Sequence, residues 1–296
     1  MEAAGRSFIH ILQPCGVTDP SDSSTGRLIK EDRYISDSCE SAPFVFNGSL
    51  MLMECIRPPT GGERRDYFIE ITEVKTGRQI SRFAYGYGLA SLVVEDGQVW
   101  VFASRWEDGT WNDVTLFRST DLSTWSSRKV LEQGRGEHIF NTSVCKDADR
   151  YVMAYETDDP RYVPFTVKFA RSNDLVNWDK IPGALFGPDR YAACPCLRYS
   201  DGWYYMLYLE HLSPRWWFET YMVRSKDLRT WFPSPRNPIL SPGKGEGINT
   251  SDPDLVEFEG KVYLYYCIGD QRTYGRLKRA VFHGTLEEFF QWCYQE

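Results

Sequence analysis

Short apolar runs of strand length alternate with turn residues along most of the chain. Five times between residues 40 and 268, one apolar run is followed by a turn and then by a second apolar run. Four of the five turns carry an Asn-Gly, Asp-Gly or Glu-Gly pair, which is the chemistry of a tight hairpin. The first runs with their turns are 40–48, 89–97, 141–149, 194–202 and 252–260, and the second runs are 49–54, 98–104, 151–156, 203–210 and 261–268.

An eight-residue phrase, Arg-Ser-x-Asp-Leu-x-x-Trp, ends the third apolar run of three of these units. It occupies 118–125, 171–178 and 224–231, at steps of 53 residues. Self-similarity at a fixed period of this size is typical of repeat architectures. The Asp is expected to bend the chain by accepting bonds from nearby backbone amides, and the Trp to cover the turn. Three copies around one molecule cannot share one substrate, so the phrase is predicted to be structural.

Five units of about fifty residues, each a short antiparallel meander, predict an all-β, five-bladed β-propeller with four-stranded blades. The chain is expected to form one domain, with blades at about 34–84, 85–133, 134–183, 184–240 and 241–290. The last unit lacks a fourth strand, and the apolar run Phe8–Leu12 is expected to fill that position and close the ring. The helical spacing of Thr285–Cys293 predicts a short C-terminal helix.

Composition excludes some classes of function. The net charge of −7 argues against nucleic-acid binding, which needs clustered Lys and Arg. No run of eighteen apolar residues exists, so no membrane partner is expected. Residues Met1–Ser7 lack the basic start and apolar core of a signal peptide, which favours a cytoplasmic location, with secretion after removal of a signal as the alternative. The eight cysteines show no paired CxxC spacing, so they are predicted to be buried free thiols.

Acidic and polar residues recur at two positions that converge in a propeller. The first strand of each blade lines the axis. Because the first and second strands are antiparallel, the start of one and the end of the other lie on the same face. Carboxylates gathered in a concave site acquire separated pKa values, as acid–base catalysis requires. The resulting candidates are Glu40, Asn141 and Asp252 at first-strand starts, and Arg105, Trp106, Glu156, Glu210, His211 and Arg272 at second-strand ends.

Each candidate also has a structural interpretation. Glu40 could cap a strand, and Asp252 could belong to an ordinary turn. Glu210 follows a long apolar run, where an unpaired charge would be costly, so an ion pair with an arginine of a neighbouring blade would explain it without catalysis. Trp106 could pack in the fold instead of forming a sugar platform.

The five units, the three phrases and an acidic residue opening a first strand resemble the five-bladed propeller glycoside hydrolases of families 43, 32, 62, 68, 117 and 130, over about residues 34–290. In those enzymes a carboxylate at the start of the first strand of blade 1 acts as base or nucleophile, and Glu40 stands there. Many carry a second acid in blade 3, where this chain has Asn141. Family 43 opens blade 4 with a Glu-Gly-Pro proton donor, whereas this chain reads Ala193-Cys194-Pro195.

The resemblance implies a glycosidase that acts on an oligosaccharide, exo-acting and inverting, with no required cofactor and with a structural cation on the axis left open. Glu40 would activate water or attack the anomeric carbon, and Glu210 or Asp252 would protonate the leaving oxygen; the separation of the two carboxyls decides between retention and inversion. Two alternatives stay open. One is a glycoside phosphorylase on the same fold, with Arg105, Arg190 and Arg272 as its cations, and the other is a sugar-binding propeller without catalysis. The sugar, the linkage and the oligomeric state do not follow from the sequence.

Overall fold

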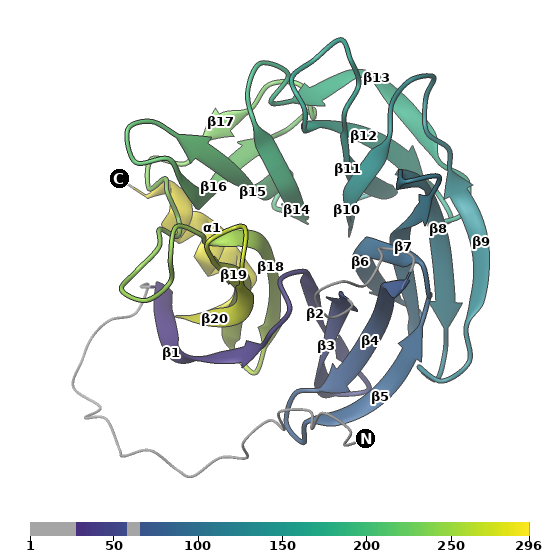
Figure 1. Ribbon diagram of the computed structural model, residues 1–296, viewed down its shortest axis with the longest axis horizontal. Helices are drawn as coiled ribbons and strands as arrows, with labels where there is room; N and C mark the ends of the chain where they lie inside the picture. The colour runs from purple at the N-terminus through teal and green to yellow at the C-terminus, as the bar shows by residue number, and fades with distance from the viewer. Residues whose placement is uncertain (1–27, 58–65, 296) are drawn as a thin grey trace.

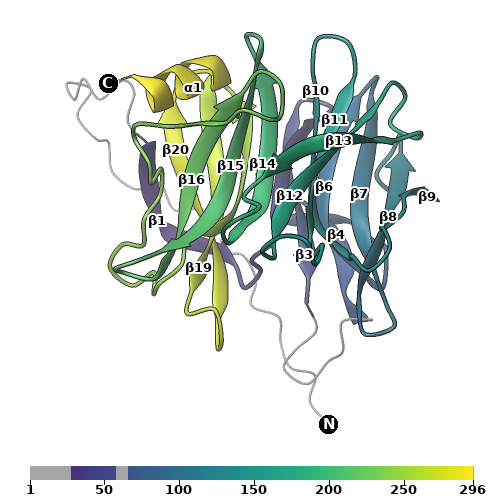
Figure 2. The same ribbon diagram turned by 90° about the horizontal axis from the view of Figure 1, so that it is seen from above.

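The computed structural model describes residues 28–57 and 66–295, whose strands form five four-stranded antiparallel sheets around a ring (Figure 1). The predicted all-β, five-bladed propeller is therefore confirmed. In each sheet the first strand lies nearest the ring's centre, and the strands run between the two faces of the ring (Figure 2). Blades 1 and 2 consist of β2 (Ser41–Phe46), β3 (Ser49–Ile56), β4 (Phe68–Glu73), β5 (Arg78–Phe83), β6 (Tyr87–Glu95), β7 (Gln98–Glu107), β8 (Thr110–Ser119) and β9 (Ser126–Leu131).

The remaining three blades follow the same order, except that the last one borrows a strand from the start of the chain. Blade 4 ends in a fourth strand of only two residues. Blades 3, 4 and 5 consist of β10 (Ile139–Lys146), β11 (Tyr151–Thr157), β12 (Thr166–Ser172), β13 (Asp179–Phe186), β14 (Ala192–Ser200), β15 (Trp203–Leu212), β16 (Trp217–Ser225), β17 (Phe232–Pro233), β18 (Ser251–Phe258), β19 (Lys261–Gly269), β20 (Gly275–His283) and β1 (Leu28–Ser36).

An N-terminal strand closes the ring, as predicted, but it is not the strand that the sequence suggested. β1 pairs antiparallel with β20, from Leu28 opposite Phe282 to Ser36 opposite Leu277. The predicted segment, Phe8–Leu12, lies outside the described residues. The closing strand escaped notice because it is half-exposed and contains four consecutive charged residues, 30–33, so its apolar signal is weak. It leads directly into β2, and the chain crosses from blade 5 to blade 1 in four residues.

Each repeated phrase bends the chain and fastens its blade to the one before. In the first copy, the Asp121 carboxylate accepts the backbone N–H groups of Ser123 and Thr124, each at 2.8 Å, and the other two copies repeat this pattern. The tryptophan then reaches back: Trp125 stacks on Phe83 of blade 1, with ring centroids 3.8 Å apart. In the later copies, Trp178 contacts Phe102 of blade 2 edge to face, and Trp231 stacks on Phe169 of blade 3. The structural role predicted for the phrase is confirmed.

The fourth interface, between blades 4 and 5, is covered by the predicted C-terminal helix instead of a tryptophan. α1 (Leu286–Tyr294) begins at a capping box, in which the Thr285 hydroxyl accepts the Glu288 N–H and the Glu288 carboxylate accepts the Thr285 N–H. Its buried residues Phe289, Phe290 and Cys293 belong to a cluster of sixteen buried apolar residues, whose other members come from the two blades. None of the described helices is long and apolar enough to cross a membrane.

The fifth interface, where blade 5 meets blade 1, has far less apolar contact. Among the described residues its cluster holds three buried side chains, Leu52, Tyr265 and Leu277, against eleven to sixteen in each of the other four clusters. A disulfide between Cys39 and Cys267 crosses this interface. The prediction of free thiols is therefore wrong for these two cysteines, because partners 228 residues apart show no pattern in sequence.

The other described cysteines are free: Cys55, Cys145, Cys196 and Cys293 are buried, and Cys194 is half-buried. Disulfides persist mainly in oxidising compartments, and the Cys39–Cys267 bridge therefore does not support the cytoplasmic location expected from the sequence. That location stays a prediction.

Candidate active site

Bulges open the first strands of four blades, at the end of the ring where the candidate residues lie. The pairing of first and second strands shifts register at Gly88/Ser91, Ile139/Thr142, Ala193/Cys196 and Ser251/Asp254. Leu89, Cys194 and Asp252, which occupy equivalent positions, have positive φ angles of 55°, 53° and 50°. Non-glycine residues adopt this conformation only where the surrounding structure holds them, and bulges next to sites re-aim side chains.

The first strands of blades 3, 4 and 5 come into contact through these side chains. The Cys194 thiol donates to Asp252 Oδ1 at 3.1 Å. The backbone N–H of Cys194 donates to Glu156 Oε1, and Asn141 Nδ2 donates to Glu156 Oε2 at 3.1 Å. Ser251 Oγ donates to the second oxygen of Asp252. The structure thus brings three predicted site residues, Asn141, Glu156 and Asp252, into one cluster around Cys194.

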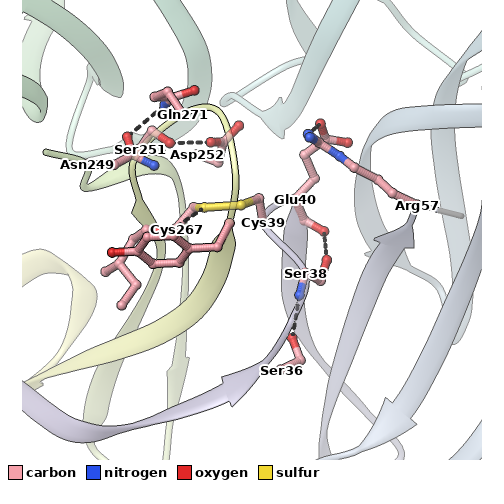
Figure 3. The surroundings of a disulfide bond; sticks show 12 residues. Ser36, Ser38, Cys39, Glu40, Arg57, Asn249, Ser251, Asp252, Cys267 and Gln271 are labelled. Carbon is pink, nitrogen blue, oxygen red and sulfur yellow. Dashed lines mark hydrogen bonds and ion pairs between the residues drawn. A yellow bond between two sulfur atoms is a disulfide. The ribbon is translucent and has the colours of Figure 1, made fainter. Parts of the chain in front are cut away.

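Glu40 joins this cluster from the start of blade 1 and is held by an ion pair. Arg57, which follows β3, donates through Nη2 to Glu40 Oε1. Figure 3 shows the two side chains pointing toward each other. The second oxygen of Glu40 is buried and accepts no hydrogen bond from the described residues. A buried acceptor without a donor is unusual in a native fold and is consistent with a place that a ligand or water completes.

The carboxyls of this cluster lie in unlike surroundings. Burial raises the pKa of Glu156 to about 8. Burial also raises the pKa of Asp252, and the neighbouring charge of Glu40 adds to the effect. Glu40 has the Arg57 cation beside it, whereas neither Glu156 nor Asp252 has an ion-pair partner among residues 28–57 and 66–295. An ion-paired carboxylate beside carboxyls whose neutral forms are favoured by burial is the kind of contrast that acid–base chemistry uses.

A cavity of about 250 Å³ opens beside Asp252. Its volume falls just below the usual range for ligand pockets, about 300–1,000 Å³. Both half-cystines of the disulfide line it, so the bridge that closes the ring is also a wall of the cavity. Its lining is Cys39, Arg57, Asn249, Ser251, Asp252, Cys267, Gln271, Arg272, Thr273, Tyr274 and Gly275.

Glu210, the other candidate proton donor, has a different environment. It lies at the end of β15, where Arg190 Nε approaches its Oε1 at 3.0 Å and the Tyr208 hydroxyl donates to its Oε2 at 2.8 Å. Arg190 precedes β14 of the same blade. Glu210 is not among the main charges that act on Asp252 or Glu156. The alternative interpretation of Glu210 as half of an ion pair therefore matches its contacts, except that the arginine comes from the same blade and not from a neighbouring one.

The remaining predicted binding residues divide between the cavity and the rim. Arg272 lines the cavity. Arg105 is half-exposed and pairs with Glu107 of its own strand at 2.9 Å. Trp106 contacts the buried Trp111 edge to face, with centroids 5.3 Å apart. His211 stacks on Phe218 at 4.1 Å, and its Nε2 lies 2.7 Å from the carbonyl oxygen of Trp216.

No group of three or more His, Cys, Asp or Glu side chains in the described part of the chain is arranged to hold a metal ion. A structural cation on the propeller axis remains a hypothesis from the family resemblance.

Comparison with solved structures identifies the fold. The chain matches the protein BT0996, solved in an RGII complex, with a TM-score of 0.68 at 17% identity, over 87% of this chain and 91% of that one. A protein named as a glycoside hydrolase gives 0.65 at 15% identity, over 88% and 92%. A GH43_1 enzyme from Xanthomonas citri, complexed with xylose, gives 0.62 at 12% identity, over 84% and 90%. No protein-family model matches the sequence, and no curated protein matches it significantly.

The chain therefore has the five-bladed propeller fold of glycoside hydrolases, and the predicted resemblance is confirmed at the level of fold. Identities of 12–17% carry the argument no further than the fold, so the activity rests on the chain's own residues.

Several residues of this site were not selected from the sequence. The topological rule places Arg57, at a second-strand end, and Cys194, at a first-strand start, in the converging set, but neither received a catalytic or binding role from the sequence. Cys194 occupies a first-strand start, but a single thiol carries no chemical signature. Asn249 and Gln271, which bond to each other at 2.8 Å across the cavity wall, lie in loops whose shape no pattern predicts.

Proposed function

We propose that the protein is a glycosidase in which Glu40 and Asp252 divide the acid–base work. The carrying observation is the contrast between the two carboxyls: Glu40 is paired with Arg57, whereas Asp252 has no ion-pair partner among the described residues, has a raised pKa and borders the cavity. Asp252, whose pKa is raised by burial and by the charge of Glu40, serves as the acid that protonates the leaving oxygen. Glu40, the carboxylate paired with Arg57, activates water. Positioned acid–base catalysis of this kind contributes about 10²–10⁴-fold.

Glu156 and Asn141 act as positioning residues in this proposal. Both oxygens of Glu156 already accept hydrogen bonds, from Cys194 N–H and Asn141 Nδ2, so Glu156 is occupied by contacts within the protein. The Cys194 segment, fixed by Glu156, in turn donates its thiol to Asp252. The expected consequence is that Glu156 sets the orientation of the acid and does not contact the substrate.

Exo-action and inversion belong to the same proposal. The small volume of the cavity supports the binding of a single terminal sugar. Inversion follows from the family resemblance and from a base that activates water. Release of one sugar per turnover tests exo-action, and proton NMR of the first product formed, before mutarotation, tests inversion.

The division of labour is tested with Asp252→Asn and with two kinds of substrate. Once a panel of aryl glycosides and oligosaccharides has given an active pair, the variant is expected to lose about 10²–10⁴-fold on the unactivated oligosaccharide. It should lose much less on the dinitrophenyl glycoside, whose leaving group needs no proton. Glu40→Gln should lose activity equally on both. Glu210→Gln is the matched control, and the selective loss appearing there instead of at Asp252 would refute the assignment.

A phosphorylase is the second candidate, and one observation favours it: Arg57 and Arg272 both line the cavity. Of the cations expected from the sequence, Arg105 and Arg190 are instead paired with Glu107 and Glu210. Turnover that requires inorganic phosphate and yields a sugar phosphate would establish this reaction in place of hydrolysis.

A further inference from the structure

Arg272 is unusual among the cations near the candidate site because its side chain has no partner among the described residues. Arg57, Arg190 and Arg276 all lie within ion-pair distance of a carboxylate. No ion pair with a carboxylate and no contact with an aromatic ring joins the guanidinium of Arg272 to the described residues, although Arg272 lines the cavity.

Hydrogen bonds within the protein hold the loop that carries Arg272, without any ligand. Asp270 Oδ1 accepts the backbone N–H groups of Arg272, Thr273 and Tyr274, at 2.9, 2.7 and 3.2 Å. These bonds, together with one from the Thr273 hydroxyl, lower the pKa of Asp270, so the loop is held by a charged acceptor near neutral pH. A loop already ordered in its binding conformation costs less to order when a ligand arrives.

The cavity has an excess of positive charge beside Asp252. Its lining holds two cations, Arg57 and Arg272, and one carboxyl, Asp252. The charge of Arg57 is matched by Glu40, and burial favours the neutral form of Asp252. Arg272 is therefore the charge in the lining that nothing described neutralises.

A neutral donor faces the same space. Gln271 Nε2 donates to Asn249 Oδ1 at 2.8 Å (Figure 3), which fixes the orientation of the Asn249 amide. Asn249 is almost fully buried and lines the cavity, and the bond from Gln271 occupies its amide oxygen, not its amide nitrogen. A guanidinium and an amide donor on one wall are the groups that recognise a carboxylate or a phosphate.

We propose that the cavity beside Asp252 binds an oxyanion, either the carboxylate of an acidic sugar or inorganic phosphate, with Arg272 as its charged anchor and Asn249 as its amide donor. This inference rests on the proposed function, because it names the substrate class of the same site: a uronic-acid glycoside in the first case, a phosphate co-substrate in the second.

Calorimetric titration of the full chain tests it without turnover. The probes are glucuronate and galacturonate, their neutral counterparts glucose and galactose, and inorganic phosphate. We expect at least one uronate to bind ten-fold or more tightly than its neutral counterpart, or phosphate to bind on its own; the first result assigns the anion to the sugar and the second to phosphate. In either case affinity should fall as salt rises, since the contact is ionic.

The variant Arg272→Gln should weaken binding of that anion at least ten-fold and leave any binding of a neutral sugar unchanged. Arg128→Gln, which alters an exposed arginine on the outer strand β9, is the matched control and should bind as the parent does. Equal affinity for acidic and neutral sugars with no binding of phosphate overturns the inference, as does an unchanged affinity in Arg272→Gln or the absence of binding with every probe. Hydrolysis of a neutral glycoside without anion binding would overturn this inference alone, whereas anion binding without hydrolysis would overturn only the proposed function.

Discussion

Removing the Cys39–Cys267 disulfide should destabilise the protein more than any other change of comparable size. The bridge closes a loop of 228 residues. In the chain-entropy model, opening a loop of this length releases about 18 cal/mol/K in the unfolded state, which corresponds to about 5 kcal/mol at 25 °C. The native interface gives little to offset the loss, because the cluster between blades 5 and 1 contains only three buried apolar residues among those described.

The expected shift in midpoint follows from the length of the chain. An unfolding entropy of about 2.1 cal/mol/K per residue gives about 0.6 kcal/mol/K for 296 residues, so 5 kcal/mol corresponds to about 8 °C in Tm. The assay compares the oxidised parent, the reduced parent and the double variant Cys39→Ala, Cys267→Ala by guanidinium unfolding followed through tryptophan fluorescence. Reduction should raise the thiol count of the unfolded parent by two.

Activity should fall with stability, because Cys39 directly precedes Glu40 and both half-cystines line the cavity. A displacement of about 1 Å at a catalytic group costs up to about 100-fold. The reductant control is the double variant itself, which reductant should not affect. The reasoning fails if the reduced parent unfolds within about 1 kcal/mol of the oxidised parent, or if the double variant remains as stable as the oxidised parent.

Two further predictions concern a buried carboxyl and a half-buried tryptophan. The pKa of Glu156 is about 8 in the folded protein and near 4.5 in the unfolded chain, so between these values the native state binds a proton that unfolding releases. The contribution of Glu156 to stability is therefore full below pH 4.5 and is lost as the pH rises toward 8. The loss is at most about 5 kcal/mol. Glu156→Gln, which stays neutral, should reduce the loss of stability between pH 5 and 8 in chemical unfolding; parallel pH profiles of variant and parent would contradict this. Trp125→Ala should cost about 3–5 kcal/mol, because it removes the ring stacked on Phe83 and the bond from its Nε1 to Ser81 Oγ at 2.9 Å. Trp125→Phe, which keeps a ring, should recover more than half of that loss in the same unfolding measurement, and equal losses in the two variants would show that stacking does not hold the interface.

The blade count could be predicted because the sequence repeats it. The 53-residue step of the phrase and the turn pairs state the period directly, and each phrase makes local bonds that depend on few distant residues. The closing strand could not be found in the same way. Its four consecutive charged residues, 30–33, give the edge strand no apolar pattern. Lys30 and Glu31 form ion pairs with Glu246 and Arg279, which lie far along the chain.

For the candidate site, topology predicted positions and could not predict partners. The antiparallel rule selected Asn141, Glu156 and Asp252, which the structure joins in one cluster around Cys194. The same rule selected Glu210, but its pairing with Arg190 depends on the path of the loop before β14. Partners of this kind are set by loop shape, which a single sequence does not specify.

The three tryptophan contacts all run in one direction, from a blade back to its predecessor. During synthesis from the N-terminus, each unit that carries the phrase therefore brings the ring that covers the interface with the preceding blade, and three interfaces form in this way as the chain lengthens. Closure of the ring differs, because β1 can pair only with β20, which is synthesised some 240 residues later. At about 5–20 residues per second, this edge stays unpartnered for about 12 to 50 seconds of translation, an interval in which its four consecutive charges discourage pairing with another chain.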